Sequence, residues 1–174
     1  MSKRYKIFTD CNAPPYGGWT NESARYFPGG DRAGKWITPI EGKLVACRNG
    51  YHVCTKFTLM ENVLMICFSG RTPLYVYEVE TKEEERIAPA KNLLMKIQGK
   101  KRVCRSYRVM GFVGAVSISK AKSAIPIRTE RLYAREMLDV PYRTLQKASV
   151  VLLHDLEKHP RCPNAPVQTT AIYR

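Results

Sequence analysis

The 174-residue sequence predicts an α+β protein with a mostly antiparallel sheet, a short helix in its middle and two helices near its C-terminus. Three features support this prediction: stretches of alternating polarity, one strong hairpin signal and apolar residues at helical spacing. Hydrophobic residues make up 44% of the chain and charged residues 25%, which is ordinary globular usage. We expect a core domain over residues 1–110 and a helical extension over residues 111–174 that packs on or beside it.

The N-terminal part predicts one strand and then a long loop. Residues 5–9 alternate and contain aromatic and β-branched side chains, as expected of a first strand. Residues 10–34 are dense in Asn, Pro, Gly and Asp, which predicts an irregular connection. Loops of this length are usually functional or mobile.

Residues 44–54 carry the clearest local signal, a β-hairpin. The pair Asn49-Gly50 offers the positive φ angles that a type I′ turn requires. If these two residues form the turn, side-chain alternation places Cys47, His52 and Cys54 on one face. The facing pairs are then Arg48 with Tyr51, Cys47 with His52, and Val45 with Cys54.

A short helix and two further strands follow the hairpin. Residues 58–61 resemble a capping box, and apolar residues continue at helical spacing until Gly70 stops the helix. Residues 73–79 predict a strand, and the acidic residues 78–85 predict an exposed loop after it. Residues 101–110 alternate again and predict a strand with one very basic side.

Two helical patterns end the chain. The first covers about residues 129–138. The second starts near Pro141, because proline is well tolerated in the first turn of a helix. These two segments make up most of the predicted helical extension.

The net charge of +14 indicates a polyanionic partner. No acidic residue occurs between Glu85 and Glu130, whereas lysine and arginine recur throughout that stretch. Six cations within residues 96–108, with a tyrosine among them, suit phosphate contacts plus one stacking ring. The alternative is a solvated basic face without a dedicated partner. The predicted nucleic-acid contacts are Lys96, Lys100, Lys101, Arg102, Arg105, Tyr107 and Arg108.

The cysteines suggest either a metal site or buried thiols. On one hairpin face, Cys47, His52 and Cys54 would supply three zinc ligands if Cys11 or Cys104 completed a tetrahedron. Their Cys-x4-His-x-Cys spacing differs from the usual zinc signatures, so the alternative is that they are small buried residues. We expect reduced thiols and a cytoplasmic protein, because the basic start lacks the apolar segment of a secretory signal. The longest apolar run, residues 63–68, is too short to cross a membrane.

Five segments between residues 5 and 110 occur in a recognisable order. They read Tyr-Lys-Ile-Phe, Pro-Tyr-Gly-Gly-Trp, Gly-Lys-Leu-Val-Ala-Cys-Arg-Asn-Gly-Tyr-His-Val-Cys, Leu-Tyr-Val-Tyr-Glu-Val and Lys-Arg-Val-Cys-Arg-Ser-Tyr-Arg-Val-Met. Together they resemble a family of small bacteriophage proteins whose hallmark is Cys-x-x-Gly-Tyr/Phe-His-x-Cys. The resemblance implies a viral origin and a place in the bacterial host cytoplasm, but it implies no activity.

A more distant resemblance concerns ADP-ribosyltransferases. The order Gly50-Tyr-His-Val, then a helix, then a strand from Leu74, is similar to the middle of those enzymes. This resemblance places His52 at the position of the nicotinamide-site tyrosine and implies NAD as the cofactor. Two parts of the enzyme pattern are not evident: the opening His-Gly or Arg-Gly motif near residues 5–8, and a catalytic glutamate within residues 101–110.

Three hypotheses follow for the function. The first is a phage-encoded basic protein that grips the phosphate backbone of DNA or RNA without sequence specificity, in host takeover or genome handling. The second is an ADP-ribosyltransferase-like enzyme that modifies a host target. The third is a virion or host-inhibitor protein that acts through protein contacts. The sequence does not decide whether the protein is an enzyme, nor does it give the oligomeric state.

Overall fold

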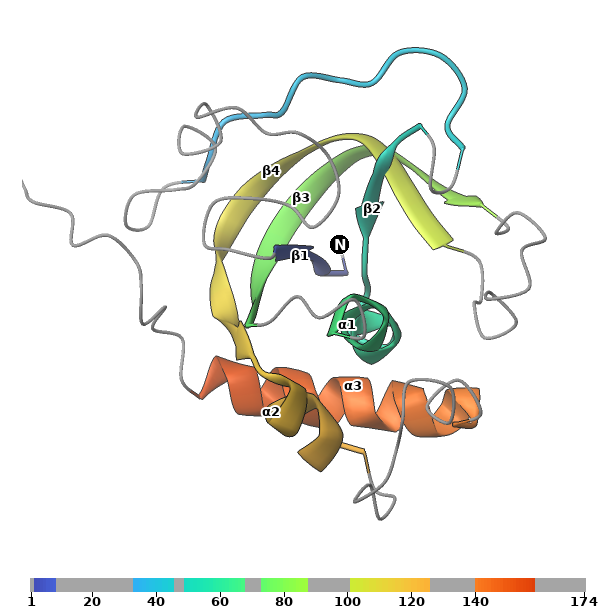
Figure 1. Cartoon of the computed structure of the whole chain (residues 1–174). Helices are drawn as coiled ribbons and strands as arrows, with labels where there is room; N and C mark the ends of the chain where they lie inside the picture. The colour runs from blue at the N-terminus through green and yellow to red at the C-terminus, as the bar shows by residue number, and fades with distance from the viewer. Residues whose placement is uncertain are drawn as a thin grey trace, which may run out of the picture.

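The computed structural model describes residues 2–8, 33–45, 49–67, 73–87, 101–125 and 140–158 (Figure 1). Within these ranges it contains an antiparallel sheet with helices packed against it, so the predicted α+β class is confirmed. The elements are β1 (Arg4–Phe8), β2 (Tyr51–Val53), α1 (Leu59–Cys67), β3 (Leu74–Ile87), β4 (Lys101–Val116), α2 (Ile118–Ser123) and α3 (Tyr142–Glu157).

The long antiparallel pair β3–β4 forms the centre of the sheet. The strand order is β1-β3-β4-β2, and each neighbouring pair is antiparallel. The register of β3 against β4 shifts between Val76 and Tyr77 and again between Glu78 and Val79. Such bulges bend a strand and increase its twist. The two strands accordingly curve over α1, while α3 runs below it (Figure 1).

The two outer strands meet, so the sheet closes on itself. The N–H of Tyr5 in β1 donates to the carbonyl of Cys54 at 2.9 Å, and the N–H of Cys54 donates back at 2.7 Å. Residues 34–40 run beside β4 without forming a strand, and three of their backbone N–H groups donate to carbonyls of β4. These bonds join Gly34 to Val109, Ile37 to Tyr107, and Ile40 to Arg105.

Apolar side chains on the two faces of the sheet form separate clusters. The larger cluster joins β1 residues such as Ile7 to α1, α2 and α3. The smaller one includes Phe8, Tyr77 and Tyr107. The C-terminal helix α3 therefore shares its core with the first strand.

The acidic loop predicted over residues 78–85 is wrong, because this stretch lies inside β3. Arginines of β4 compensate glutamates of this strand: Glu80 pairs with the directly opposite Arg108, and Glu84 pairs with Arg102. The predicted boundary after residue 110 also falls inside an element, because β4 continues to Val116.

The predicted hairpin register is wrong as well. Val45 bridges to Asn49, and each backbone N–H of this pair donates to the other's carbonyl. Asn49 therefore lies in the bridge and not in the turn, and its side chain donates to two carbonyls of the preceding segment. Cys54 faces Tyr5 instead of Val45, because closure of the sheet adds a non-local pairing that competes with the local one.

Other expectations hold. The first strand, the helix α1 and the helix that starts after Pro141 are confirmed. Thr58, the first residue of the predicted capping box, lies directly before α1. Its hydroxyl accepts a hydrogen bond from the backbone N–H of Thr55. Cys54 and Cys104 are buried free thiols, as expected. The predicted loop over residues 10–34 lies almost entirely outside the described residues, and the predicted helix over residues 129–138 lies wholly outside them.

Close packing of α3 on β4 gives a first prediction. A Cβ atom at Gly114 would lie 2.8 Å and 2.9 Å from side-chain atoms of Leu156 and 3.2 Å from its Cα. Gly114→Ala should therefore push α3 off the sheet and lower the free energy of unfolding by about 1–3 kcal/mol. The matched control is Gly111→Ala in the same strand, where a Cβ meets nothing within 4 Å. Equal urea midpoints for the two variants would contradict this packing.

Lys6 is a buried amine at the closure of the sheet. It is 7% exposed, and its Nζ donates to the carbonyl of His52 at 3.0 Å. The ammonium lies 4.8 Å from the ring centroid of Tyr107 and 5.8 Å from that of Tyr51. Burial lowers the pKa of Lys6 to about 8, and no carboxylate in the described part of the chain pairs with it.

This lowered pKa predicts a stability that depends on pH. Burial of the charged amine costs stability below pH 8, and the cost disappears as the pH rises to the ordinary value of 10.5. In that window the folded protein has released a proton that the unfolded chain retains. The stability of the wild type relative to Lys6→Met should therefore rise by about 2–3 kcal/mol across it. Urea unfolding at several pH values measures this difference, and parallel pH curves for the two proteins would rule it out.

Candidate functional site

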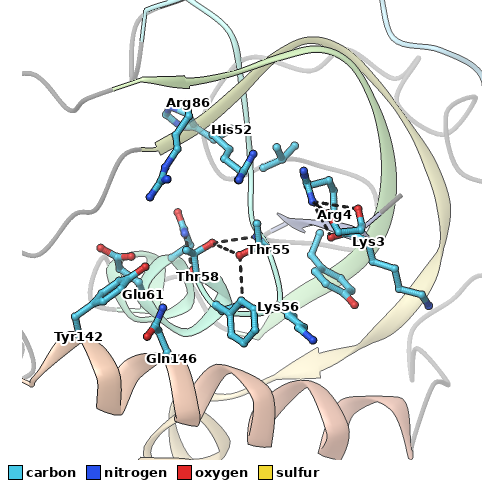
Figure 2. A pocket seen from close by; sticks show the side chains of 16 residues that line it. Lys3, Arg4, His52, Thr55, Lys56, Thr58, Glu61, Arg86, Tyr142 and Gln146 are labelled. Carbon is cyan, nitrogen blue, oxygen red and sulfur yellow. Dashed lines mark hydrogen bonds between the residues drawn. The ribbon is translucent and has the colours of Figure 1, made fainter.

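A cleft of about 540 Å³ opens beside the bridge between Tyr5 and Cys54. One part of its wall comes from residues 2–5, the C-terminal end of β3 and the N-terminal end of β4. The other part comes from the turn between β2 and α1, the first turn of α1 and the start of α3. Arg86 and His52 extend toward it from the sheet, whereas Glu61, Tyr142 and Gln146 approach from the helices (Figure 2).

The cleft is strongly basic. Among the residues that the structure describes, five cationic side chains line it but only one carboxylate, that of Glu61. Residues far apart in the sequence supply these cations, and closure of the sheet brings them together. They are Lys3, Arg4, Lys56, Arg86 and Arg102.

Carboxylates of β3 hold three of these cations in place. Lys3 donates to Glu78 at 2.8 Å, and both Arg4 and Arg102 donate to Glu84. The side chain of Glu84 is 12% exposed. Although its burial acts in the opposite direction, the hydrogen bonds and charges of the two arginines hold the pKa of Glu84 below its ordinary value of 4.5. This carboxylate therefore stays ionised and fixes both guanidinium groups.

The other two cations, Lys56 and Arg86, carry the surplus charge. Within the described ranges neither forms an ion pair, and both residues are exposed. Arg86 lies directly opposite Arg102 in the β3–β4 register. Even with Glu61, Glu78 and Glu84 all counted against the five cations, two positive charges remain at the cleft.

Carboxylates of β3 oppose the arginines of the predicted basic face that the structure describes. Arg102, Arg105 and Arg108 each pair with a glutamate of β3. Arg105 also donates to the carbonyls of Ile40 and Gly42. These three arginines are therefore not unopposed cations, and their role as nucleic-acid contacts remains a prediction. Among the predicted contacts whose side chains the structure describes, only Arg102 lines the cleft.

The ring predicted to stack on a base is buried. Tyr107 is 0% exposed and packs edge-on against Tyr51 at a centroid distance of 5.2 Å. Lys96 and Lys100 lie outside the described residues, and the side chain of Lys101 is not among those described. The prediction for these three lysines remains a prediction.

The structure describes two of the three predicted zinc ligands. His52 faces Val103 of β4, and Cys54 is buried beside Tyr5. Cys47 lies outside the described residues. Among the residues with described side chains, no group of three or more His, Cys, Asp and Glu is placed to hold a metal ion. Zinc bound through Cys47 remains a prediction.

Sequence reasoning missed Lys3, Arg4, Lys56 and Arg86 as a group. The basic start of the chain and the acid-free stretch from Arg86 were visible as separate features. Their meeting depends on the closure between Tyr5 and Cys54, for which the sequence carries no local signal.

Comparison of the chain with protein-family models, curated proteins and solved structures gives no match. The resemblances to phage proteins and to ADP-ribosyltransferases therefore remain predictions. None of the helices described for this chain is both long and apolar enough to cross a bilayer.

Proposed function

We propose that this protein binds the phosphate backbone of a nucleic acid in the basic cleft. The observation that supports the proposal most is the surplus of cations at one hollow, with Lys56 and Arg86 not engaged by carboxylates among the described residues. Phosphate groups are the commonest polyanionic partners of such clusters, and guanidinium groups bind them with two parallel hydrogen bonds. Within this proposal, the resemblance to phage proteins favours a role in host takeover or genome handling in the bacterial cytoplasm.

The cleft replaces the β4 arginines as the proposed contact surface. Arg105 and Arg108 pair with glutamates and do not line the cleft, whereas Arg86 lines it and forms no ion pair among the described residues. Contacts to phosphate carry no information on base identity, so we propose binding without sequence specificity.

A second candidate is an ADP-ribosyltransferase-like activity. The observation in its favour is that His52, which the resemblance places at the nicotinamide site, lines the same cleft. NAD also carries two phosphates that the cations could hold. A host protein would then be the acceptor.

The proposal predicts the effect of removing the surplus charge. Arg86→Gln combined with Lys56→Gln should weaken binding of a labelled oligonucleotide and reduce the slope of log affinity against log salt by about 1–2. Fluorescence anisotropy over a salt series measures both quantities. The matched control is Lys35→Gln with Lys43→Gln, which removes the same charge from exposed positions of residues 33–45 that do not line the cleft.

If the two double variants lose the same affinity, the cleft is not the binding site, because only the net charge of the protein would then determine binding. Absence of binding by the wild type at about 50 mM salt would overturn the function itself. NAD added as a competitor separates the second candidate. If NAD displaces the oligonucleotide and its ADP-ribose group is transferred to a host protein, the transferase is favoured.

A further inference from the structure

The shape of the cleft restricts the form of nucleic acid that can enter it. Its volume of about 540 Å³ lies within the roughly 300–1,000 Å³ of pockets that enclose a small ligand. In a duplex the bases are paired and stacked, and the double helix is stiff over lengths far greater than the cleft. A duplex would touch only the rim. The unpaired bases of a single strand can be splayed out into a hollow of this size.

Two exposed aromatic rings stand beside the cations. Phe57, in the turn between β2 and α1, is 45% exposed, and Tyr142, the first residue of α3, is 39% exposed. Both line the cleft, and the ammonium of Lys56 lies 4.8 Å from the ring centroid of Phe57. Single-strand-binding proteins combine a positive groove with rings on which bases stack. The cleft contains both components.

The facing pair Arg86 and Arg102 suits a phosphate group. These arginines occupy directly opposed positions on β3 and β4, and both line the cleft. Glu84 holds Arg102 in position, while Arg86 is exposed. A phosphate between them would receive donors from both strands. The opposed like charges would also be relieved, because a phosphate compensates them.

We infer that the cleft selects single-stranded nucleic acid, with one or two nucleotides inside, a phosphate at Arg86 and Arg102, and bases stacked on Phe57 and Tyr142. This inference rests on the proposed function and names its ligand class. The bases of DNA and RNA can both stack on an aromatic ring, so the inference covers single strands of either kind.

The test compares three ligands and two kinds of aromatic variant. Labelled oligo(dT), oligo(U) and a DNA duplex of the same length are titrated in fluorescence anisotropy at fixed salt. Phe57→Leu and Tyr142→Leu remove a ring but keep an apolar side chain, whereas Phe57→Tyr and Tyr142→Phe keep the ring. Thermal unfolding of each variant verifies that it is folded.

We expect at least one single strand to bind about tenfold or more tightly than the duplex. Each leucine variant should lose about 5- to 100-fold on that strand, and the ring-retaining variants should bind like the wild type. Equal or tighter duplex binding, or leucine variants with wild-type affinity, would overturn the inference. If either result were found but Arg86→Gln still weakened binding, the proposed nucleic-acid binding in the cleft would stand and only the selection of single strands would be wrong. Failure of all three ligands to bind would overturn the proposed function.

Discussion

The carboxylate of Glu84 is the interaction on which the arrangement of charge in this protein depends. It lies on β3 and accepts hydrogen bonds from Arg4 of β1, Arg102 of β4 and the hydroxyl of Thr81. One side chain thus ties three strands together next to the cleft. Because a partly buried carboxylate with two arginines is held ionised, its position also fixes theirs.

The other glutamates of β3 extend this pattern and decide which cations remain for a ligand. Glu80 and Glu83 neutralise Arg108 and Arg105, so the middle of β4 offers little unopposed charge. The C-terminal end of β3 differs, because Arg86 there faces an arginine of β4 and not a glutamate. Closure of the sheet then brings Lys56 and the N-terminal cations to the same place. The basic cleft is therefore what remains after the strands have paired their charges.

The local elements could be read from the sequence, whereas the site could not. Periodicity predicted the first strand, α1 and α3, because amphipathic patterns are properties of contiguous residues. The acidic stretch within β3 looked like a loop, since glutamate is unfavourable in strands unless a cross-strand partner compensates it. For Glu84 that partner, Arg102, lies 18 residues away, and the pairing of β3 with β4 that brings the two together is set by tertiary structure. The bridge from Tyr5 to Cys54 is equally non-local.

The account is tested most directly by the affinity of Glu84→Gln for oligo(dT), measured together with its stability. Loss of this carboxylate should lower the free energy of unfolding by about 1–3 kcal/mol, because two arginines lose their charged partner. The same change removes one negative charge beside the cleft, so affinity should rise several-fold and the salt slope should steepen by about 1. A folded variant whose affinity is unchanged or lower would contradict the claim that β3 carboxylates set the charge available in the cleft.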